Sequence, residues 1–474
     1  MNVLKKFFKD TVIYGLATVL PRLMNFLLVP LHTDKLQTTS YSDNTTFYVY
    51  AAFFNVLLTY GMETAFFRFF NKSEQKGKVF STVFISLIST TVLFLIGVLI
   101  FSQHLATWLN IAPKYLKILL GLLVLDTLVV APFAYLRATG RPIKFAAIKI
   151  SNILIYVILN YFFLWAIPYF QFNFLWFDNT DLVYYIFVAN LIASMVTFLL
   201  LLPYFFKTKI KFSISILKQL LNYGWPIMVA GLAYVINDNF DKWILPYLLN
   251  KDINGAYSAC YKIAMFMTIF IQAFRLGAEP FFFSHATKEN AKETYALIMK
   301  FFVIAGSFML VFIVSYLDFF KSILVKDASY WEAITIVPIV LLANLCLGIY
   351  FNLAIWYKLT DKTIYGMYFS VVGAIITIAL NLILIEKIGF IAAAWATLAA
   401  YGSMMVLSYF FGQRHYPVPY NLKQILFYLV ISIGLSIVAI NTNANYYINT
   451  VLVLVFLGII IISEKKQLKQ LINR

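Results

Sequence analysis

The sequence predicts an all-α polytopic membrane protein, and two observations carry this prediction. Hydrophobic residues make up 62% of the 474 residues and charged residues only 12%, which leaves too little polar surface for a soluble domain. Apolar segments of about 17 to 25 residues, the length that crosses a bilayer, recur from end to end. Short polar breaks separate them, so no soluble domain is expected.

About fourteen transmembrane helices are predicted. The last two are short, so twelve spans followed by a re-entrant pair is an alternative. The predicted spans are Thr11–Leu31, Phe47–Phe67, Val79–Phe101, Ile118–Leu136, Phe145–Ile167, Val183–Tyr204, Tyr223–Leu245, Ala256–Phe274, Phe301–Leu317, Ile334–Trp356, Ile364–Ile385, Gly389–Phe411, Ile425–Ile440 and Tyr447–Ile462.

The first span is predicted to be retained, because no small-residue cleavage site follows "MNVLKKFFKD" and Arg22 interrupts the apolar stretch. The loops and tails on the same side of the membrane as the N-terminus hold 24 Lys and Arg residues, and the loops on the opposite side hold 7. Since basic residues stay in the cytoplasm, both termini are predicted to be cytoplasmic. The net charge of +17 is then mainly a topological signal, with membrane lipids as partners and no nucleic acid.

Two heptapeptides reveal an internal repeat. "GMETAFF" (61–67) and "GAEPFFF" (277–283) share the pattern Gly-x-Glu-x-x-Phe-Phe at an offset of 216. "LRATGRPIKF" (136–145) and "YKLTDKTIYG" (357–366) match at an offset of 221, as do Asn160 and Asn381. Because the three matches keep the same order, a chance alignment of Phe-rich spans is disfavoured.

Matched spans lie six apart, an even number, so spans 1–6 and spans 7–12 share one orientation. This predicts two six-helix lobes in a parallel repeat, with a pseudo-two-fold axis along the membrane normal and a site between the halves. The expected domains are residues 1–210 for the N-terminal lobe, 211–415 for the C-terminal lobe, and 416–474 for a C-terminal helix pair and cytoplasmic tail.

Three cations inside the spans are the substrate-binding candidates, because an ionisable group there costs about 2.5 to 3.5 kcal/mol and marks function. Arg22 stands halfway along span 1, about 15 Å from either end, so it faces either an anion or a paired Asp126 or Asp241. Lys262 and Arg275 lie on nearly one face of span 8, and Arg275 is close enough to the cytoplasm to snorkel.

Five carboxylates are the coupling or gating candidates. Asp126, in the middle of span 4, either pairs with a cation or takes up a proton. Asp238 and Asp241 share one face of span 7 with Lys242, which predicts either local neutralisation or a gate or cation site. The repeated pair Glu63 and Glu279 lies near the cytoplasmic end of the second span of each half, where a structural or gating role is favoured over substrate contact.

Several kinds of site are not predicted. Cys260 and Cys346 fall within spans and the four histidines are scattered, so no disulfide, metal site or cofactor is expected. The phosphate loop Gly-x4-Gly-Lys-Ser/Thr is missing from the sequence, which disfavours an ATP-driven pump. The short loops disfavour an enzyme, including a membrane-embedded glycan enzyme.

The segment "YGLATVLPRLMNFLLVPL" (14–31) and the start of the second half, "NYGWPIMVAGLAYVINDNFDKWIL" (222–245), resemble the polysaccharide exporters of the multidrug/oligosaccharidyl-lipid/polysaccharide (MOP) superfamily. The resemblance covers the whole chain. It implies a flippase in the bacterial inner membrane that carries a polyprenyl-diphosphate-linked oligosaccharide of the O-antigen type, by alternating access, for surface polysaccharide and lipopolysaccharide biosynthesis. Related lipid II flippases keep cations in a central cavity, and Arg22 and Lys262 match that pattern.

The physics agrees with an anionic substrate. Fixed cations lower the barrier for a diphosphate across about 30 Å of hydrocarbon, and its outward movement gains about 2.3 kcal/mol per charge per 100 mV. The membrane potential, H+ or Na+ is the expected driving force. The alternatives are a cation-coupled multidrug antiporter, which would need an anionic cavity, and a lipid II flippase.

Overall fold

The computed structural model describes residues 13, 15, 19–21, 23–172, 174–205, 211–441 and 445–472. The described residues form helices and no strands, which confirms the predicted all-α polytopic fold. They contain eleven helices that are long and apolar enough to cross a membrane, and each coincides with a predicted span. Both helices of the C-terminal pair are among them, so the re-entrant alternative is not needed.

The chain forms two compact units, Met1–Gly255 and Ala256–Arg474. Helix α13 (Lys251–His285) begins at the end of the first unit and continues into the second. The other helices of unit 1 are α2 (Val29–Lys35), α3 (Thr38–Thr59), α4 (Met62–Lys72), α5 (Lys76–Ile100), α6 (Ser102–Trp108), α7 (Pro113–Leu128), α8 (Val130–Ala138), α9 (Pro142–Tyr161), the π-helical turn η1 (Phe162–Ala166), α10 (Ile167–Phe170), α11 (Leu182–Phe205) and α12 (Ile214–Leu248).

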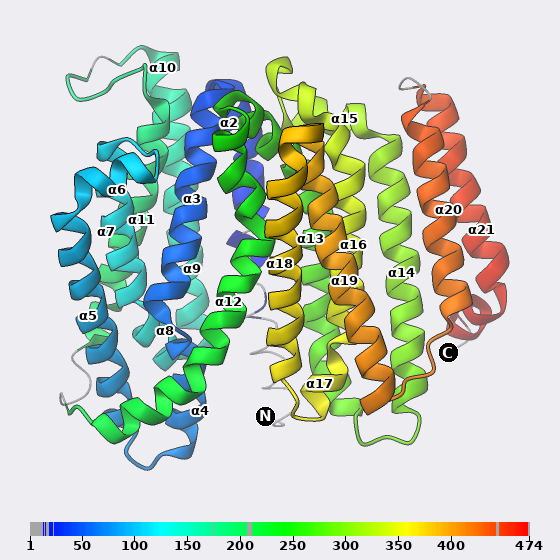
Figure 1. Ribbon diagram of the computed structural model, residues 1–474, viewed down its shortest axis with the longest axis horizontal. Coiled ribbons are helices and arrows are strands. Elements are labelled where there is room, and N and C mark those ends of the chain that lie inside the picture. Colours follow the sequence, from blue (N-terminus) through cyan, green and yellow to red (C-terminus); the bar gives the residue numbers. More distant parts are fainter. Residues whose placement is uncertain are drawn as a thin grey trace. The chain divides into compact units, whose positions relative to one another are not determined.

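In unit 1 the helix α11 packs on α7 and α9, while α3 contacts α7, α11 and α12 (Figure 1). Although α12 was predicted to begin the second lobe, it packs along α3, α4 and α5. The lobe boundaries at residues 210 and 415 stay a prediction.

In its described residues, unit 2 continues α13 and adds eight α-helices and a 3-10 segment. Its centre is formed by α16, which packs on α14 and α19, while α18 packs on α19, and α20 and α21 pack on α14 (Figure 1). The elements are α14 (Ala291–Ser315), α15 (Leu317–Leu324), the 3-10 helix η2 (Ala328–Ile336), α16 (Val337–Leu353), α17 (Ile355–Leu359), α18 (Ile364–Ile388), α19 (Ile391–His415), α20 (Leu422–Ile440) and α21 (Tyr446–Ile472).

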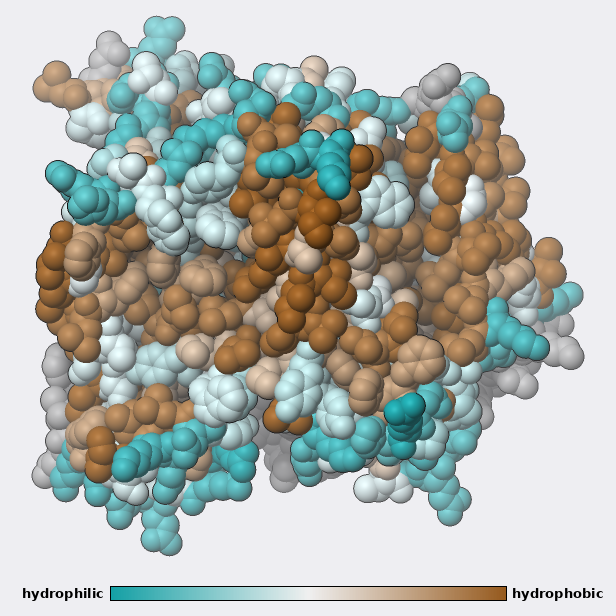
Figure 2. Space-filling view, viewed as in Figure 1, coloured by the Kyte–Doolittle hydropathy of each residue, from teal (hydrophilic) through white to brown (hydrophobic). Residues whose placement is uncertain are grey.

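The outer faces have the polarity that a bilayer requires. Figure 2 shows hydrophobic residues over the length of α18 and α20, and hydrophilic residues gathered at the helix ends. Side chains such as Ile375, Ile383 and Val430 are more than half exposed. Because only helices satisfy all their backbone groups within lipid, these exposed apolar faces belong in contact with hydrocarbon.

The second predicted span, Phe47–Phe67, is wrong in its boundaries. Helix α3 covers Thr38–Thr59, and the chain then breaks at Tyr60 and Gly61, which have φ values of 31° and 75°. The position of Gly61 requires glycine, because a Cβ there would collide with the backbone carbonyl of Gly224. Glu63 therefore lies in the first turn of a separate helix, α4.

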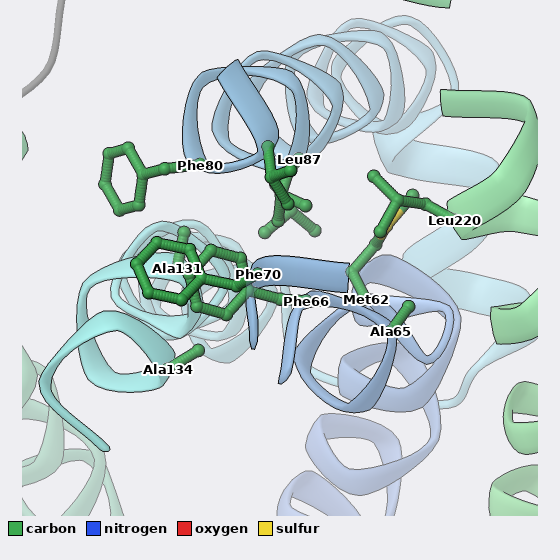
Figure 3. Close-up of a cluster of buried hydrophobic side chains, with 11 residues drawn as sticks. Met62, Ala65, Phe66, Phe70, Phe80, Leu87, Ala131, Ala134 and Leu220 are labelled. Atoms are coloured by element: carbon green, nitrogen blue, oxygen red, sulfur yellow. The ribbon is translucent and has the colours of Figure 1, made fainter. Parts of the chain in front are cut away.

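A buried cluster fixes α4 in unit 1. Met62, Phe66 and Phe70 of α4 pack on Phe80 and Leu87 of α5 (Figure 3). Leu220 of α12 lies near Met62 in the same cluster, and Ala131 and Ala134 of α8 close it. Burial of large apolar side chains contributes about 1.5 to 3 kcal/mol each, so α4 is held firmly although it is short.

Candidate functional site

Asp126 lies at the centre of a polar network inside unit 1. The Ser194 hydroxyl of α11 donates to Asp126 Oδ1 over 3.0 Å. Asn55 of α3 and Lys149 of α9 also interact with the Asp126 carboxyl group. The Lys149 ammonium lies 4.4 Å from the centroid of the Phe133 ring. Side chains of three helices, α3, α9 and α11, thus gather around one carboxylate of α7.

The network continues along α3, α9 and α11. The hydroxyls of Tyr48 and Tyr156 lie 3.1 Å apart, and Asn190 Nδ2 donates to Tyr48 over 3.1 Å. Asn152 Nδ2 donates to the Thr197 hydroxyl over 2.9 Å. A carboxylate that has a hydroxyl, an amide and one ammonium group as neighbours can take up a proton or a hard monovalent cation. The described residues contain no group of three or more His, Cys, Asp or Glu side chains that would hold a metal ion.

His32 extends this network and was not singled out from the sequence. Its Nε2 lies 2.9 Å from Asn160 Oδ1, and Asn160 Nδ2 donates to the Tyr156 carbonyl over 2.8 Å. Both side chains are buried. Asn381 makes the corresponding bond in unit 2, from Nδ2 to the Thr377 carbonyl over 2.7 Å.

Asp241 and Lys242 form a buried ion pair on α12. Lys242 Nζ lies 3.1 Å from Asp241 Oδ1 and donates to the Asp238 carbonyl over 2.7 Å. The exposed fractions of Asp241 and Lys242 are only 2% and 7%. This geometry favours local neutralisation of Asp241 by Lys242, while Asp238 contacts Lys242 through its backbone.

The repeated glutamates both bind a cation that lies just after the fourth predicted span of their half. In unit 1, Arg137 Nη1 of α8 lies 2.8 Å from Glu63 Oε1, and its guanidinium lies 4.7 Å from the Phe67 ring. In unit 2, Lys358 Nζ of α17 lies 2.7 Å from Glu279 Oε1. Arg137 and Lys358 are related by the offset of 221.

The second copy carries an additional cation. Arg275 Nη2 lies 3.1 Å from Glu279 Oε1, and its guanidinium stacks 4.0 Å from the Phe351 ring centroid. Two cations therefore share one carboxylate in unit 2, whereas the Glu63–Arg137 pair of unit 1 is neutral. The cluster of Arg275, Glu279 and Lys358 has a net positive charge, which can attract an anion.

The structure does not test two further substrate-binding candidates, Arg22 and Lys262. Arg22 lies outside the described residues, so its role stays a prediction. Lys262 lies on α13, thirteen residues before Arg275, and its side chain is partly buried. Its assignment to substrate binding also stays a prediction.

The repeat contained a signal for Arg137 and Lys358. Each stands two residues before the matched threonines Thr139 and Thr360. Both threonine hydroxyls donate to the carbonyl four residues earlier, over 2.8 Å and 2.9 Å. The next residues, Gly140 and Asp361, both have positive φ, at 65° and 56°. Both cations lie within the matched segments 136–145 and 357–366, so the alignment itself pairs Arg137 with Lys358.

Comparisons with known proteins agree with this architecture. A family model described as "Polysaccharide biosynthesis protein" matches residues 7–284. The fold is similar to that of the lipid II flippase MurJ in an inward closed conformation, with a TM-score of 0.71 and 16% identity over 96% of this chain and 100% of that one. No curated protein sequence matches the chain.

Two other solved structures share the fold. An inward-facing multidrug resistance MATE family transporter of the MOP superfamily gives a TM-score of 0.62 and 13% identity over 85% of this chain and 94% of that one. A MOP superfamily transporter from Pyrococcus furiosus gives 0.58 and 12%, over 86% and 95%. The Pyrococcus transporter is described as having a binding pocket of reverse polarity.

Proposed function

The chain belongs to the polysaccharide biosynthesis protein family of the MOP superfamily, and from this membership we propose that it flips a polyprenyl-diphosphate-linked oligosaccharide. As a multi-pass membrane flippase or exporter, it would move this lipid from the inner to the outer leaflet for surface polysaccharide biosynthesis. In the proposed orientation both termini face the cytoplasm of a bacterium.

The observation that supports an anionic substrate is the charge of the Arg275, Glu279 and Lys358 cluster. One carboxylate faces two cations at 3.1 Å and 2.7 Å, which leaves one positive charge for a ligand. Arginine can bind phosphate oxygens with two parallel hydrogen bonds, and Lys262 adds a further cation on the same helix. A drug antiporter that carries cationic substrates would need a binding site with a net negative charge.

The Asp126 network supports ion coupling in the same protein. Its carboxylate accepts a hydrogen bond from the neutral Ser194 hydroxyl and lies near the hydrogen-bonded hydroxyls of Tyr48 and Tyr156. Protonation or cation binding at Asp126 would change its interaction with Lys149, which belongs to another helix. Asp126 is therefore our proposed coupling residue, while Asp238, Asp241 and Glu63 are assigned gating or structural roles.

A binding measurement distinguishes the proposed substrate from a cationic drug. The purified protein in detergent is titrated with a polyprenyl diphosphate bearing one sugar, with the corresponding polyprenyl alcohol, and with ethidium. We expect the diphosphate to bind at least tenfold more tightly than the alcohol, with the preference lost in Arg275→Gln/Lys358→Gln. Tight binding of ethidium without a preference for the diphosphate would favour the antiporter.

A further inference from the structure

Unit 1 contains an apolar cavity of about 670 Å3 between α3, α5 and α12. This volume lies within the range of ligand pockets, about 300 to 1,000 Å3. Its walls include Leu57 of α3, Ile85 of α5, and Leu221 and Trp225 of α12. Leu221 and Trp225 are 41% and 54% exposed, so the cavity opens on the outer surface of the unit.

Two hydroxyl groups in the wall, those of Ser86 and Thr90, are hydrogen-bonded within their own helix. Ser86 donates to the Thr82 carbonyl over 2.8 Å, and Thr90 donates to the Ser86 carbonyl over 2.9 Å. The Tyr60 hydroxyl lies beside Ser86 and Thr90. Because the Ser86 and Thr90 hydroxyls bond within their own helix, a hydrocarbon chain can fill the space without leaving these donors unpaired.

Lysines lie in the two chain segments next to one end of the cavity. Phe212 lines this end, next to Lys211, and the Ser213 amide donates to the Thr82 hydroxyl over 3.2 Å. Lys78 lies one turn before Thr82 on α5. The segments 72–78 and 211–218 together hold five lysines and one carboxylate, Glu74. In the proposed orientation this end faces the cytoplasmic leaflet, where phosphate headgroups of anionic lipids lie.

We propose that this cavity is a binding site for an anionic phospholipid of the cytoplasmic leaflet. One acyl chain lies between α3, α5 and α12, and the headgroup phosphate lies at Lys78, Lys211 and Lys218. Charge complementarity selects this occupant, because an apolar slot with a basic rim matches a lipid with an anionic head. The proposal depends on the orientation assigned above but not on the transported substrate.

The site is placed to affect the contact between α3 and α12. On another face of α12, Leu220 packs near Met62 (Figure 3), and Gly224 lies against the backbone of Tyr60 and Gly61. A lipid chain against Leu221 and Trp225 therefore supports the first turns of α12 from its exposed side. Loss of the lipid is expected to loosen this part of the helix.

Photolabelling in vesicles tests the proposal. The full chain is placed in phosphatidylcholine vesicles that contain a trace of phosphatidylglycerol or phosphatidylcholine with a photoactivatable acyl chain, and labelled peptides are identified by mass spectrometry. We expect phosphatidylglycerol to label residues 57–60, 85–90 and 212–228 preferentially. Each basic residue near an anionic headgroup contributes about fivefold in affinity, so Lys211→Gln/Lys218→Gln should reduce this labelling about 25-fold.

Matched variants separate the cavity from general lipid contact. Ser89→Trp fills the cavity and should abolish labelling by the phosphatidylglycerol probe. Leu93→Trp adds an indole to the same helix, at a side chain that is 69% exposed and outside the lining, and should leave labelling unchanged. For the lysines, Lys144→Gln/Lys362→Gln removes two exposed charges elsewhere and serves as the control.

Three results would overturn the proposal. The first is equal labelling by the two wild-type probes, a comparison that needs no variant to fold. The second is undiminished labelling in Ser89→Trp at a normal size-exclusion profile. The third is displacement of the phosphatidylglycerol probe by a much lower concentration of polyprenyl phosphate, which would assign the cavity to the substrate. Because none of these measures transport, failure here leaves the flippase proposal untouched.

Discussion

The carboxylates inside the spans of unit 1 have different surroundings, and this difference decides their roles. Asp241 has a buried ammonium partner 3.1 Å away, whereas the direct donor to Asp126 is the neutral hydroxyl of Ser194. Removing one partner of a buried ion pair costs about 3 to 5 kcal/mol, because the remaining charge loses its compensation. An asparagine at position 126 can still accept a hydrogen bond from Ser194.

We therefore expect Asp126→Asn to preserve folding and to abolish the dependence of transport on the H+ or Na+ gradient. Asp241→Asn should instead lower the amount of folded protein, since Lys242 loses the carboxylate it contacts. Initial transport rates measured with and without each gradient, normalised to protein in the vesicles, check both statements. Asp126→Asn leaves the positive charge of Lys149 without its nearby carboxylate. The double variant Asp126→Asn/Lys149→Gln removes both charges and serves as the control for this imbalance. Unchanged gradient dependence in Asp126→Asn would exclude it as the coupling group.

Sequence reasoning found individual charges more reliably than their partners. Asp126, Glu63 and Glu279 were identified because each charge interrupts or borders an apolar run. Ser194 and Lys149 were missed as partners of Asp126, because they belong to other spans and the sequence alone does not show which faces of two helices meet. The partners of the repeated glutamates could have been predicted from the sequence, because the repeat itself relates Arg137 to Lys358.

At the scale of helices, a buried ion pair attaches the C-terminal helices α20 and α21 to helix α14 within unit 2. Lys300 Nζ of α14 lies 2.6 Å from Glu464 Oε2 of α21, and the Tyr428 hydroxyl of α20 donates to Glu464 Oε1 over 2.8 Å. Lys300 and Glu464 are only 4% and 2% exposed. Three helices thus meet at one carboxylate. This contact holds α20 and α21, the two helices that have no counterpart in the internal repeat, against α14.

Glu464→Gln is expected to destabilise the protein by about 3 to 5 kcal/mol, because it leaves the buried Lys300 charge without its carboxylate. Tyr428→Phe removes a single hydrogen bond to that carboxylate and should cost less, about 1.5 to 3 kcal/mol. Thermal unfolding in detergent, followed by tryptophan fluorescence, gives the order of stabilities. The variant Lys300→Met/Glu464→Leu should recover most of the loss. A wild-type unfolding temperature in Glu464→Gln would show that the pair contributes nothing.

Glycine sets the close approach of α3 and α12. A Cβ at Gly224 would lie 2.8 Å from the Tyr60 carbonyl oxygen, whereas a Cβ at Gly97 of α5 would meet no atom within 4 Å. Gly224→Ala should therefore separate the helices and destabilise the fold by about 1 to 3 kcal/mol. Gly97→Ala should stabilise α5 by about 0.5 to 1 kcal/mol. The same unfolding assay checks both, and equal unfolding temperatures would contradict the packing described.

Helix positions were predictable to the extent that hydrophobicity alone determines them. Eleven predicted spans coincide with helices of the structure. The second span was misplaced because polar residues such as Asp43 and Asn44 lie in the first turns of α3, where hydropathy does not indicate a membrane helix. The break after Thr59 depends on the fit of Gly61 against Gly224, a contact between distant segments that hydropathy cannot reveal.

For the whole molecule, the parallel repeat remains a prediction with a clear geometric test. An experimental structure should superpose spans 1–6 on spans 7–12 by rotation about an axis along the membrane normal. The superposition should place Glu63 on Glu279, Asn160 on Asn381 and Arg137 on Lys358. An inverted relation, or a superposition that pairs other helices, would contradict the repeat. The similar contacts of the two glutamates favour the parallel arrangement.

The central claim is that the protein carries an anionic, lipid-linked sugar between leaflets, and leaflet-resolved transport tests it most directly. Proteoliposomes receive a polyprenyl-diphosphate sugar in the leaflet that corresponds to the cytoplasmic side, and its appearance in the other leaflet is followed by accessibility to an impermeant sugar oxidant. We predict transfer with the wild type, none in protein-free vesicles, and at least tenfold slower transfer with Arg275→Gln/Lys358→Gln at equal protein content. No transfer of the lipid, together with uptake of ethidium driven by an ion gradient, would contradict the account.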